Sequence, residues 1–346
     1  MTVMPSSPFL GAARCEPTTH TPVWFMRQAG RSLPEYRSRR GDGSILHAIK
    51  QPELAAELTL QPVHRYDVDA AVLYSDIVVP AHATGFGMDV APGTGPVAAE
   101  PFRSAHDLGR IRPLEPEVDT PYVLDTVRIL AAELRVPLLA FAGAPFTVAS
   151  YLIEGRPSKT YEHTKALMHT DESLWHELLG RLADQAIASI SSQIEAGASA
   201  FQLFDSWAGA LSRVDYERYV LAHSTRVFTE LARLHPTAPG IHFGVGCDHL
   251  LEAMYTAGPA VIGLDWRTRI ADARQRLGAQ AVVQGNLDPA LVLAGWPVAR
   301  AGCQAVLGDN GGHPGHIFNL GHGVQPNTDP GVLEQIVAFV HEATRS

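Results

Sequence analysis

The sequence predicts an α/β protein, a single (β/α)8 barrel of the TIM type, and two patterns support this prediction. Eight short apolar segments alternate with segments of helical spacing, which is typical of a parallel sheet covered by helices. Most of the apolar segments end in a polar residue, and barrels of this kind carry their chemistry at the carboxyl ends of their strands. An open doubly wound sheet is the alternative, but no Gly-x-Gly-x-x-Gly opens the first strand-to-helix turn.

The first half of the chain contains three of the predicted strands. The first one leads directly into Arg27, and Pro52 is suited to the first turn of the helix that comes next. In order, we expect strand 23–26, helix 53–66, strand 69–76, a glycine-rich loop or hairpin at 83–101, helix 121–135 and strand 137–145.

The second half contains the other five strands and three long helices. Gly197 ends a long amphipathic segment, and Pro330 begins the last helix. In order, we expect helix 172–196, strand 200–206, helix 215–234, strands 240–244, 261–266, 281–288 and 316–323, and helix 330–343.

Composition excludes several classes of protein. A net charge of -9 without a long basic stripe argues against nucleic-acid binding, and no apolar run approaches the roughly 20 residues of a membrane span. The three cysteines are far apart and form no disulfide framework, so we expect a cytoplasmic protein. We expect one domain over residues 1–346, with residues 1–20 as a flexible extension.

A cluster of arginines follows the first predicted strand. Arg27 and Arg31 stand four residues apart with Gly30 between them, where a strand would give way to a turn. Arginine is suited to bidentate capture of carboxylates or phosphates, so this segment predicts an anion-binding site. The alternative is a solvated basic surface, and for the later members Arg37, Arg39 and Arg40 the sequence does not favour one interpretation over the other.

Polar groups at other strand ends are further candidates. Asp76 either faces a cationic or NH-rich ligand or caps a helix, and Tyr151 either points into the barrel mouth or packs in the core. Thr147 is placed to cap the helix that carries Tyr151. Ser206 and His322 also end strands, and the glycine-rich residues 319–323 around His322 could instead hold a phosphate.

No metal or cofactor site is expected from the sequence. There is no HExxH and no close Cys/His pair, and the nearest approach to a mixed ligand set is His242 with Cys247. The lysines, Lys50, Lys159 and Lys165, do not end apolar strands, which leaves a Schiff-base mechanism without a good candidate.

Several motifs in this order resemble the uroporphyrinogen decarboxylase family over nearly the whole chain: PVWFMRQAGRSLPEYR, YSDI, GAPFTVASYLIEG, FDSWAG, HFGVG, GLDWR, GNLDP and FNLGHG. The resemblance implies a (β/α)8 barrel, a homodimer, and a carboxy-lyase that needs no cofactor. It also implies decarboxylation of the four acetates of uroporphyrinogen III, giving coproporphyrinogen III in haem synthesis.

Carried over by motif, Arg27 and Arg31 are similar to the carboxylate-binding arginines of that family. Asp76 is similar to its central aspartate, which accepts the pyrrole NH groups, and Tyr151, Ser206 and His322 match other polar positions. Our hypothesis for catalysis places Arg27 at the reacting acetate, Asp76 at the pyrrole and Tyr151 as an assisting group. The identity of the proton donor stays open at this stage.

Two other functions compete with this one. A zinc-dependent thiol methyltransferase shares the barrel, but it places a thiolate beside the histidine at the position of His242, where this chain has Phe243 and Gly244. A non-catalytic tetrapyrrole carrier would be expected to lack Arg27 or Asp76, and both residues are present.

Overall fold

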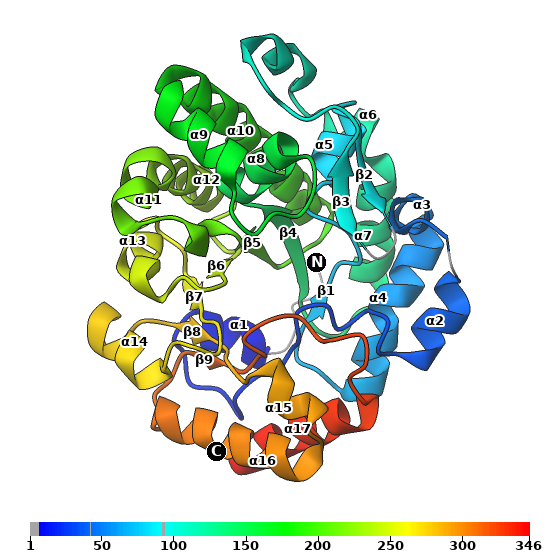
Figure 1. Cartoon of the computed structure of the whole chain (residues 1–346). Helices are drawn as coiled ribbons and strands as arrows, with labels where there is room; N and C mark the ends of the chain where they lie inside the picture. The colour runs from blue at the N-terminus through cyan, green and yellow to red at the C-terminus, as the bar shows by residue number, and fades with distance from the viewer. Residues whose placement is uncertain (1–6, 42, 92–93) are drawn as a thin grey trace.

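The computed structural model describes residues 7–41, 43–91 and 94–346. Within these residues a parallel sheet curls around the centre of the molecule, and helices cover its outside (Figure 1). Its strands follow one another in chain order: β1 (Ala71–Val72), β4 (Leu138–Gly143), β5 (Ala200–Asp205), β6 (Gly240–Gly244), β7 (Val261–Gly263), β8 (Val283–Gln284) and β9 (His316–Ile317). Because all these strands are parallel, their carboxyl ends lie along one edge, as the sequence predicts.

The predicted first strand is present as a single β-bridge between Val23 and Phe318, outside the named strands. On one side of this segment the Trp24 N–H donates to the Phe318 carbonyl at 3.3 Å. On the other side the Asp69 N–H donates to the Val23 carbonyl at 2.8 Å. Residues 22–24 therefore lie between β9 and the chain that enters β1.

The helices are α1 (Pro8–Ala13), α2 (Pro34–Arg40), α3 (Ile45–Ile49), α4 (Pro52–Tyr66), α5 (Val79–Ala83), α6 (Pro116–Asp119), α7 (Pro121–Glu133), α8 (Pro145–Glu154), α9 (Glu162–Thr170), α10 (Glu172–Ala196), α11 (Arg213–Tyr219), α12 (Leu221–Leu234), α13 (Leu251–Thr256), α14 (Ile270–Leu277), α15 (Pro289–Leu293), α16 (Trp296–Asn310) and α17 (Pro330–Ala343). Short 3-10 turns lie at Ala105–Arg110, Ala208–Ala210 and Asp248–Leu250. None of the described helices is both long and apolar enough to cross a membrane.

Most predicted helices are confirmed, but the one expected at 215–234 is interrupted. It is divided into α11 and α12 at Val220, whose φ of -125° lies outside the helical range. The preceding carbonyl, that of Tyr219, accepts a hydrogen bond of 2.9 Å from the buried indole of Trp175. A tertiary contact thus satisfies an acceptor that an uninterrupted helix would use.

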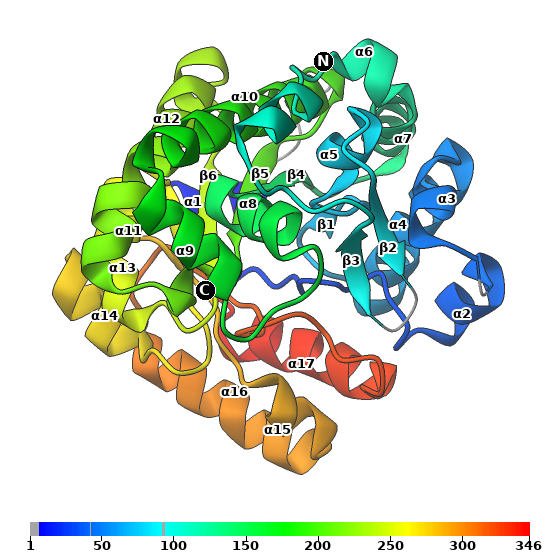
Figure 2. The ribbon, with the colours of Figure 1, turned by 45° about the horizontal axis from the view of Figure 1, so that its top comes forward.

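Two other segments settle open points of the sequence. The glycine-rich segment forms an antiparallel hairpin of β2 (Met88–Ala91) and β3 (Gly95–Ala98), which contacts α5 and α8 beside the sheet (Figure 2). Part of the expected N-terminal extension is ordered instead: α1 packs against β9, and its Phe9 is fully buried. Burial of one phenylalanine side chain contributes roughly 1.5–3 kcal/mol, which explains why this segment is held. Residues 1–6 lie outside the described residues.

Candidate active site at the carboxyl edge of the sheet

Arg27 is the first residue of the candidate site along the chain. The chain leaves the sheet at this residue in an unusual backbone conformation. Its φ is +59°, a left-handed value that is uncommon for a residue with a side chain and is found preferentially at functional positions. The side chain is exposed, and within the described ranges its guanidinium forms no ion pair. It is available to a bound anion.

The glycine-rich loop after β9 packs directly against Arg27. The Val324 N–H donates to the Met26 carbonyl at 2.8 Å, and the Met26 N–H donates to the Asn319 side chain at 3.2 Å. A Cβ on Gly323 would lie 2.5 Å from the Cδ of Arg27, so only glycine allows this approach. The first and last motifs of the sequence therefore meet at this edge.

Asp76 stands four residues beyond β1 and is half-buried. Burial raises the pKa of its carboxyl group, while the N–H groups of Val78 and Ile77 and the positive charge of Arg27 act in the opposite direction. The Val78 N–H donates to Oδ1 at 3.1 Å, just before α5 begins. Asp76 thus fixes the turn before α5 but does not cap this helix, whose N-cap residue is Val78, and it also lies within electrostatic range of Arg27.

Tyr151 lies in α8, and its ring lies against that of Trp207, with centroids 3.8 Å apart and the two planes tilted by 35°. Burial raises the pKa of its hydroxyl, the negative charge of Asp76 raises it further, and the charge of Arg27 lowers it. The phenol is therefore protonated at neutral pH. It belongs to the same cluster as Asp76 and Arg27 and is not an isolated core tyrosine.

His322 is held as a neutral side chain beside the arginine. Burial and the charge of Arg27 lower the pKa of its imidazole. Its Nδ1 accepts the Gly323 N–H at 2.7 Å, which leaves Nε2 as the nitrogen that carries the proton. The N–H groups of Leu320, Gly321 and Gly323 are all donated within the protein, which weakens the phosphate interpretation of this loop.

The remaining two predicted residues are less firmly tied to the cluster. Arg31 is exposed and Ser206 is half-buried directly after β5. Within the described residues, neither side chain makes a hydrogen bond. Both lie in segments that leave the carboxyl edge, but the residues whose pKa the charge of Arg27 lowers are Asp76, Tyr151 and His322.

A second layer of contacts fixes the loops of this edge. Thr147 does not cap α8, where Ala144 is the N-cap residue; its hydroxyl donates to buried Asp205 at 2.8 Å and accepts the Trp207 N–H at 3.2 Å. Asp205 at the end of β5 thereby holds the loop that carries Trp207.

Two residues of this edge were missed at the sequence level. Trp207 stacks on Tyr151, and Arg267 lies over the Trp266 ring at 3.9 Å while it pairs with buried Asp265 at 2.7 Å. The motifs FDSWAG and GLDWR contain them, but the contact of Trp207 with Tyr151 and that of Arg267 with Trp266 leave no periodic signal in the chain.

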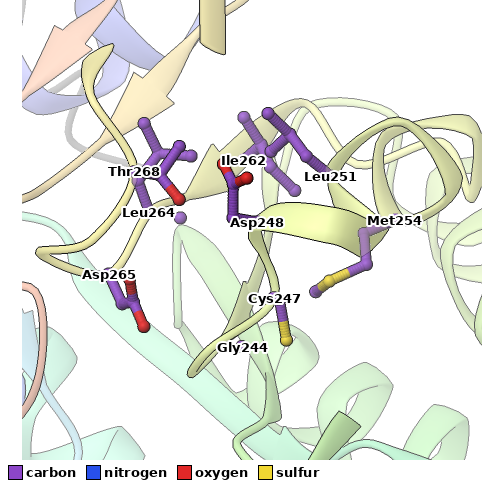
Figure 3. Close-up of a pocket in the computed structure, with 10 residues that line it drawn as sticks. Gly244, Cys247, Asp248, Leu251, Met254, Ile262, Leu264, Asp265 and Thr268 are labelled. Atoms are coloured by element: carbon purple, nitrogen blue, oxygen red, sulfur yellow. The ribbon is translucent and has the colours of Figure 1, made fainter. Parts of the chain in front are cut away.

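Two cavities lie near the cluster without being lined by Arg27, Asp76 or Tyr151. The first, beside Cys247, Met254 and Asp265, has a volume of about 10 Å³, room for about one water molecule (Figure 3). The second, about 500 Å³, lies between α15, α16 and the loops after β7 and β8.

The ligand set of a thiol methyltransferase is not assembled here. His242 is fully buried, its Nδ1 contacts the Met254 carbonyl, and its Nε2 faces Asp205 at 3.8 Å. Burial raises the pKa of the Cys247 thiol, which disfavours the thiolate that binds zinc. Among the described residues, His242 and Cys247 belong to no cluster that could hold a metal ion.

Comparisons with known proteins agree with these features. A sequence model described as uroporphyrinogen decarboxylase (URO-D) matches residues 4–343. A uroporphyrinogen decarboxylase of Salinispora tropica is 56% identical over 98% of this chain and 91% of its own length. Those of Streptomyces griseus and Mycobacterium tuberculosis are 54% and 51% identical, each over 98% of this chain and over 92% and 98% of their own lengths. A methyltransferase structure from Methanosarcina mazei shares the fold, with a TM-score of 0.80 at 19% identity over 97% of this chain and 98% of its own.

Proposed function

The chain belongs to the uroporphyrinogen decarboxylase family, and from that premise we propose how the residues at its carboxyl edge carry the reaction. The enzyme is a carboxy-lyase of haem synthesis, which converts the four acetate side chains of uroporphyrinogen III to methyl groups and gives coproporphyrinogen III. One observation carries the assignment of residues. Arg27, Asp76, Tyr151 and His322 come from four separate segments, and Arg27 lies close enough to the other three for its charge to lower the pKa of each of them, while the charge of Asp76 raises that of Tyr151.

Binding falls to the arginines in this proposal. The substrate carries eight carboxylates, and a guanidinium can hold a carboxylate through two parallel hydrogen bonds. Arg27 holds the acetate that reacts, and Arg31, four residues further along the same loop, holds a second carboxylate. Ser206 and the Nε2 proton of His322 each donate a hydrogen bond to one further carboxylate.

Asp76 accepts the pyrrole N–H groups and stabilises the positive ring. Protonation of a ring carbon gives an iminium-like cation, which withdraws the electron pair of the breaking C–C bond as carbon dioxide leaves. The exocyclic methylene formed in this step takes up a proton to become a methyl group, while the ring carbon loses the proton that it gained. Because the protonated pyrrole is itself the electron sink, we propose that no metal or organic cofactor takes part in the reaction.

An ionised Asp76 in a partly buried position is the preorganised negative charge that this cation needs. Arg27 and the backbone N–H groups favour its ionised form, whereas burial opposes it. Each tenfold of rate corresponds to about 1.4 kcal/mol of barrier, so an acceleration of many powers of ten depends on keeping water away from this ion pair.

Tyr151 assists proton delivery in this mechanism. Its raised pKa keeps the hydroxyl protonated, and the stack on Trp207 fixes the ring. Replacement of Tyr151 by phenylalanine should lower kcat at least about tenfold with little change in KM, because only the transferable proton is removed. Tyr161→Phe is the matched control, since Tyr161 contacts the same tryptophan at a longer centroid distance of 5.0 Å. Equal rates for both variants would assign proton delivery elsewhere.

We also propose the assembly that the family premise implies. Residues 22–26 serve as the eighth strand of a closed barrel. The hydrogen bonds of this segment to both Phe318 and Asp69 support this proposal. The chain folds as one domain, forms a homodimer and works in the cytoplasm. Light scattering on the purified protein measures the mass directly, and a monomer would contradict the dimer.

The function is tested by an anaerobic assay of the chelator-treated protein with uroporphyrinogen III, followed by chromatography of the oxidised products. We expect porphyrins with seven, six, five and four carboxylates to appear in turn. A folded sample that converts nothing, with zinc restoring transfer of a methyl group to a thiol, would contradict the decarboxylase.

A further inference from the structure

At the amino-terminal edge of the sheet, opposite the candidate active site, three side chains from distant segments converge. His20 precedes the Val23 bridge, Asp69 precedes β1, and His341 lies in the last turn of α17. The His20 Nε2 lies 2.8 Å from Asp69 Oδ1, and the His341 Nε2 lies 2.7 Å from Asp69 Oδ2. The two imidazole rings are tilted, with centroids 4.1 Å apart.

The chemistry of these donors is that of a divalent metal site. One atom of each side chain lies within 4.8 Å of the other two, which is close enough for one ion to reach all three. Two imidazoles and one carboxylate, with a fourth position left to water, form a common ligand set for zinc. From this geometry we propose that His20, Asp69 and His341 bind one Zn²⁺ per chain.

The surroundings of the three ligands support this proposal. The Nδ1 of His20 lies 3.1 Å from the Thr19 hydroxyl, the kind of outer contact that orients a metal-binding imidazole and leaves Nε2 for the ion. The carboxylate of Asp69 is fixed by the Val23 N–H at 2.7 Å. Asp69 is 9% exposed, while His20 and His341 are 22% and 20% exposed, so a route from solvent exists.

Such an ion takes no part in the decarboxylation, because the site lies across the sheet from Asp76. It links the segment before the first bridge, the chain entering β1 and the C-terminal helix. The ligands are separated by 49 and 272 residues, so a search for spaced ligand motifs does not find them. This proposal departs from the sequence-based expectation of no metal site, and it adds nothing to the decarboxylation mechanism.

The alternative is that the two histidines only donate hydrogen bonds to Asp69, and glutamine can separate the two roles. A glutamine amide still donates to a carboxylate but is a poor zinc ligand, so His20→Gln and His341→Gln keep the first role and lose the second. His313→Ala is the matched control, because His313 is exposed and lies outside both sites.

The experiment titrates Zn²⁺ into the untagged, chelator-treated full chain against a chromophoric chelator. We expect one site per chain with a Kd of about 1 µM or tighter, weakened at least about 100-fold in either glutamine variant and unchanged in His313→Ala. Zinc at 100 times its Kd should raise the Tm of the parent by about 3 °C and leave the variants unchanged. Zinc affinity that is the same in the parent and in both glutamine variants, or absent from all of them, would overturn the proposal.

Discussion

Two aspartates flank the same short strand, and they are held in opposite ways. Asp69, before β1, is closely surrounded: the Nε2 atoms of His20 and His341 lie within 2.8 Å of its carboxylate oxygens, and the Val23 N–H donates to it. These contacts outweigh burial and lower its pKa. For Asp76, beyond β1, burial outweighs the backbone N–H groups and Arg27, and its pKa is raised. The contacts of the fold thus favour the ionised form of Asp69 at the amino edge. Asp76 at the carboxyl edge has too few such contacts to offset its burial, and a cation of the bound substrate can supply the missing stabilisation.

Exchanging Asp76 for asparagine should give the largest effect. We expect kcat to fall at least about 10³-fold, roughly 4 kcal/mol of transition-state stabilisation. The same change should raise the Tm at neutral pH. The pKa of Asp76 is raised in the folded protein. The contribution of such a carboxyl group to the free energy of unfolding is fully present below its unfolded pKa and is lost as pH rises through its folded pKa. At pH 7 the ionised Asp76 therefore destabilises the fold, and asparagine removes this effect. The product assay and calorimetry measure the two quantities; an active Asp76→Asn enzyme would remove Asp76 from the chemistry.

The same exchange at Asp69 should have the reverse outcome. Asparagine offers one oxygen where two are used, so the free energy of unfolding should fall by about 3 kcal/mol. The kcat should stay within about twofold of the parent, because Asp69 lies at the other edge. Urea unfolding with chelator present measures this loss without any contribution from metal. A large loss of kcat in a folded Asp69→Asn protein would mean that the two edges are coupled.

Arg27→Lys tests whether a positive charge at this position is enough for catalysis. Lysine keeps the charge but loses the planar fork, and we expect kcat/KM to fall about 100-fold, or about 2.7 kcal/mol. Arg39→Lys is the control, since Arg39 is exposed and pairs with Glu57 at 2.6 Å. A rate for Arg27→Lys close to that of the parent would rule out a special role for the guanidinium.

The smallest effect is expected in the pH profile. Activity requires ionised Asp76, so kcat/KM should fall at acid pH, beginning above the ordinary range of an aspartate because the pKa is raised. Arg27 lowers this pKa, so in Arg27→Gln the acid limb should move to higher pH. The residual activity of that variant, measured from pH 5 to 9, reports the shift. A limb that moves to lower pH would contradict the pairing of Arg27 with Asp76.

The sequence predicts the helices α4, α7, α10 and α17 and the edge that carries the site, but not the helices α14 and α16. Helix α10 begins and ends where its spacing and Gly197 indicate, and α17 begins after Asp329, whose side chain accepts the Gly331 N–H. Parallel strands put Arg27 and Asp76 at a common edge, and this inference needs no side-chain detail. The break at Val220 and the stack of Tyr151 on Trp207 depend on contacts between distant segments. The His20, Asp69 and His341 cluster has the same origin, so local pattern could not predict it.

The bridge between Val23 and Phe318 has a consequence for how the chain is made. Val23 is among the first sheet residues to leave the ribosome, and its partner Phe318 is among the last. The seam of the sheet therefore cannot form during most of synthesis, while β4, β5 and β6 can pair with their neighbours as they emerge. Until Phe318 has been made, the side of Val23 that faces away from Asp69 lacks its partner, and an unpaired strand edge of this kind is prone to pair with other chains.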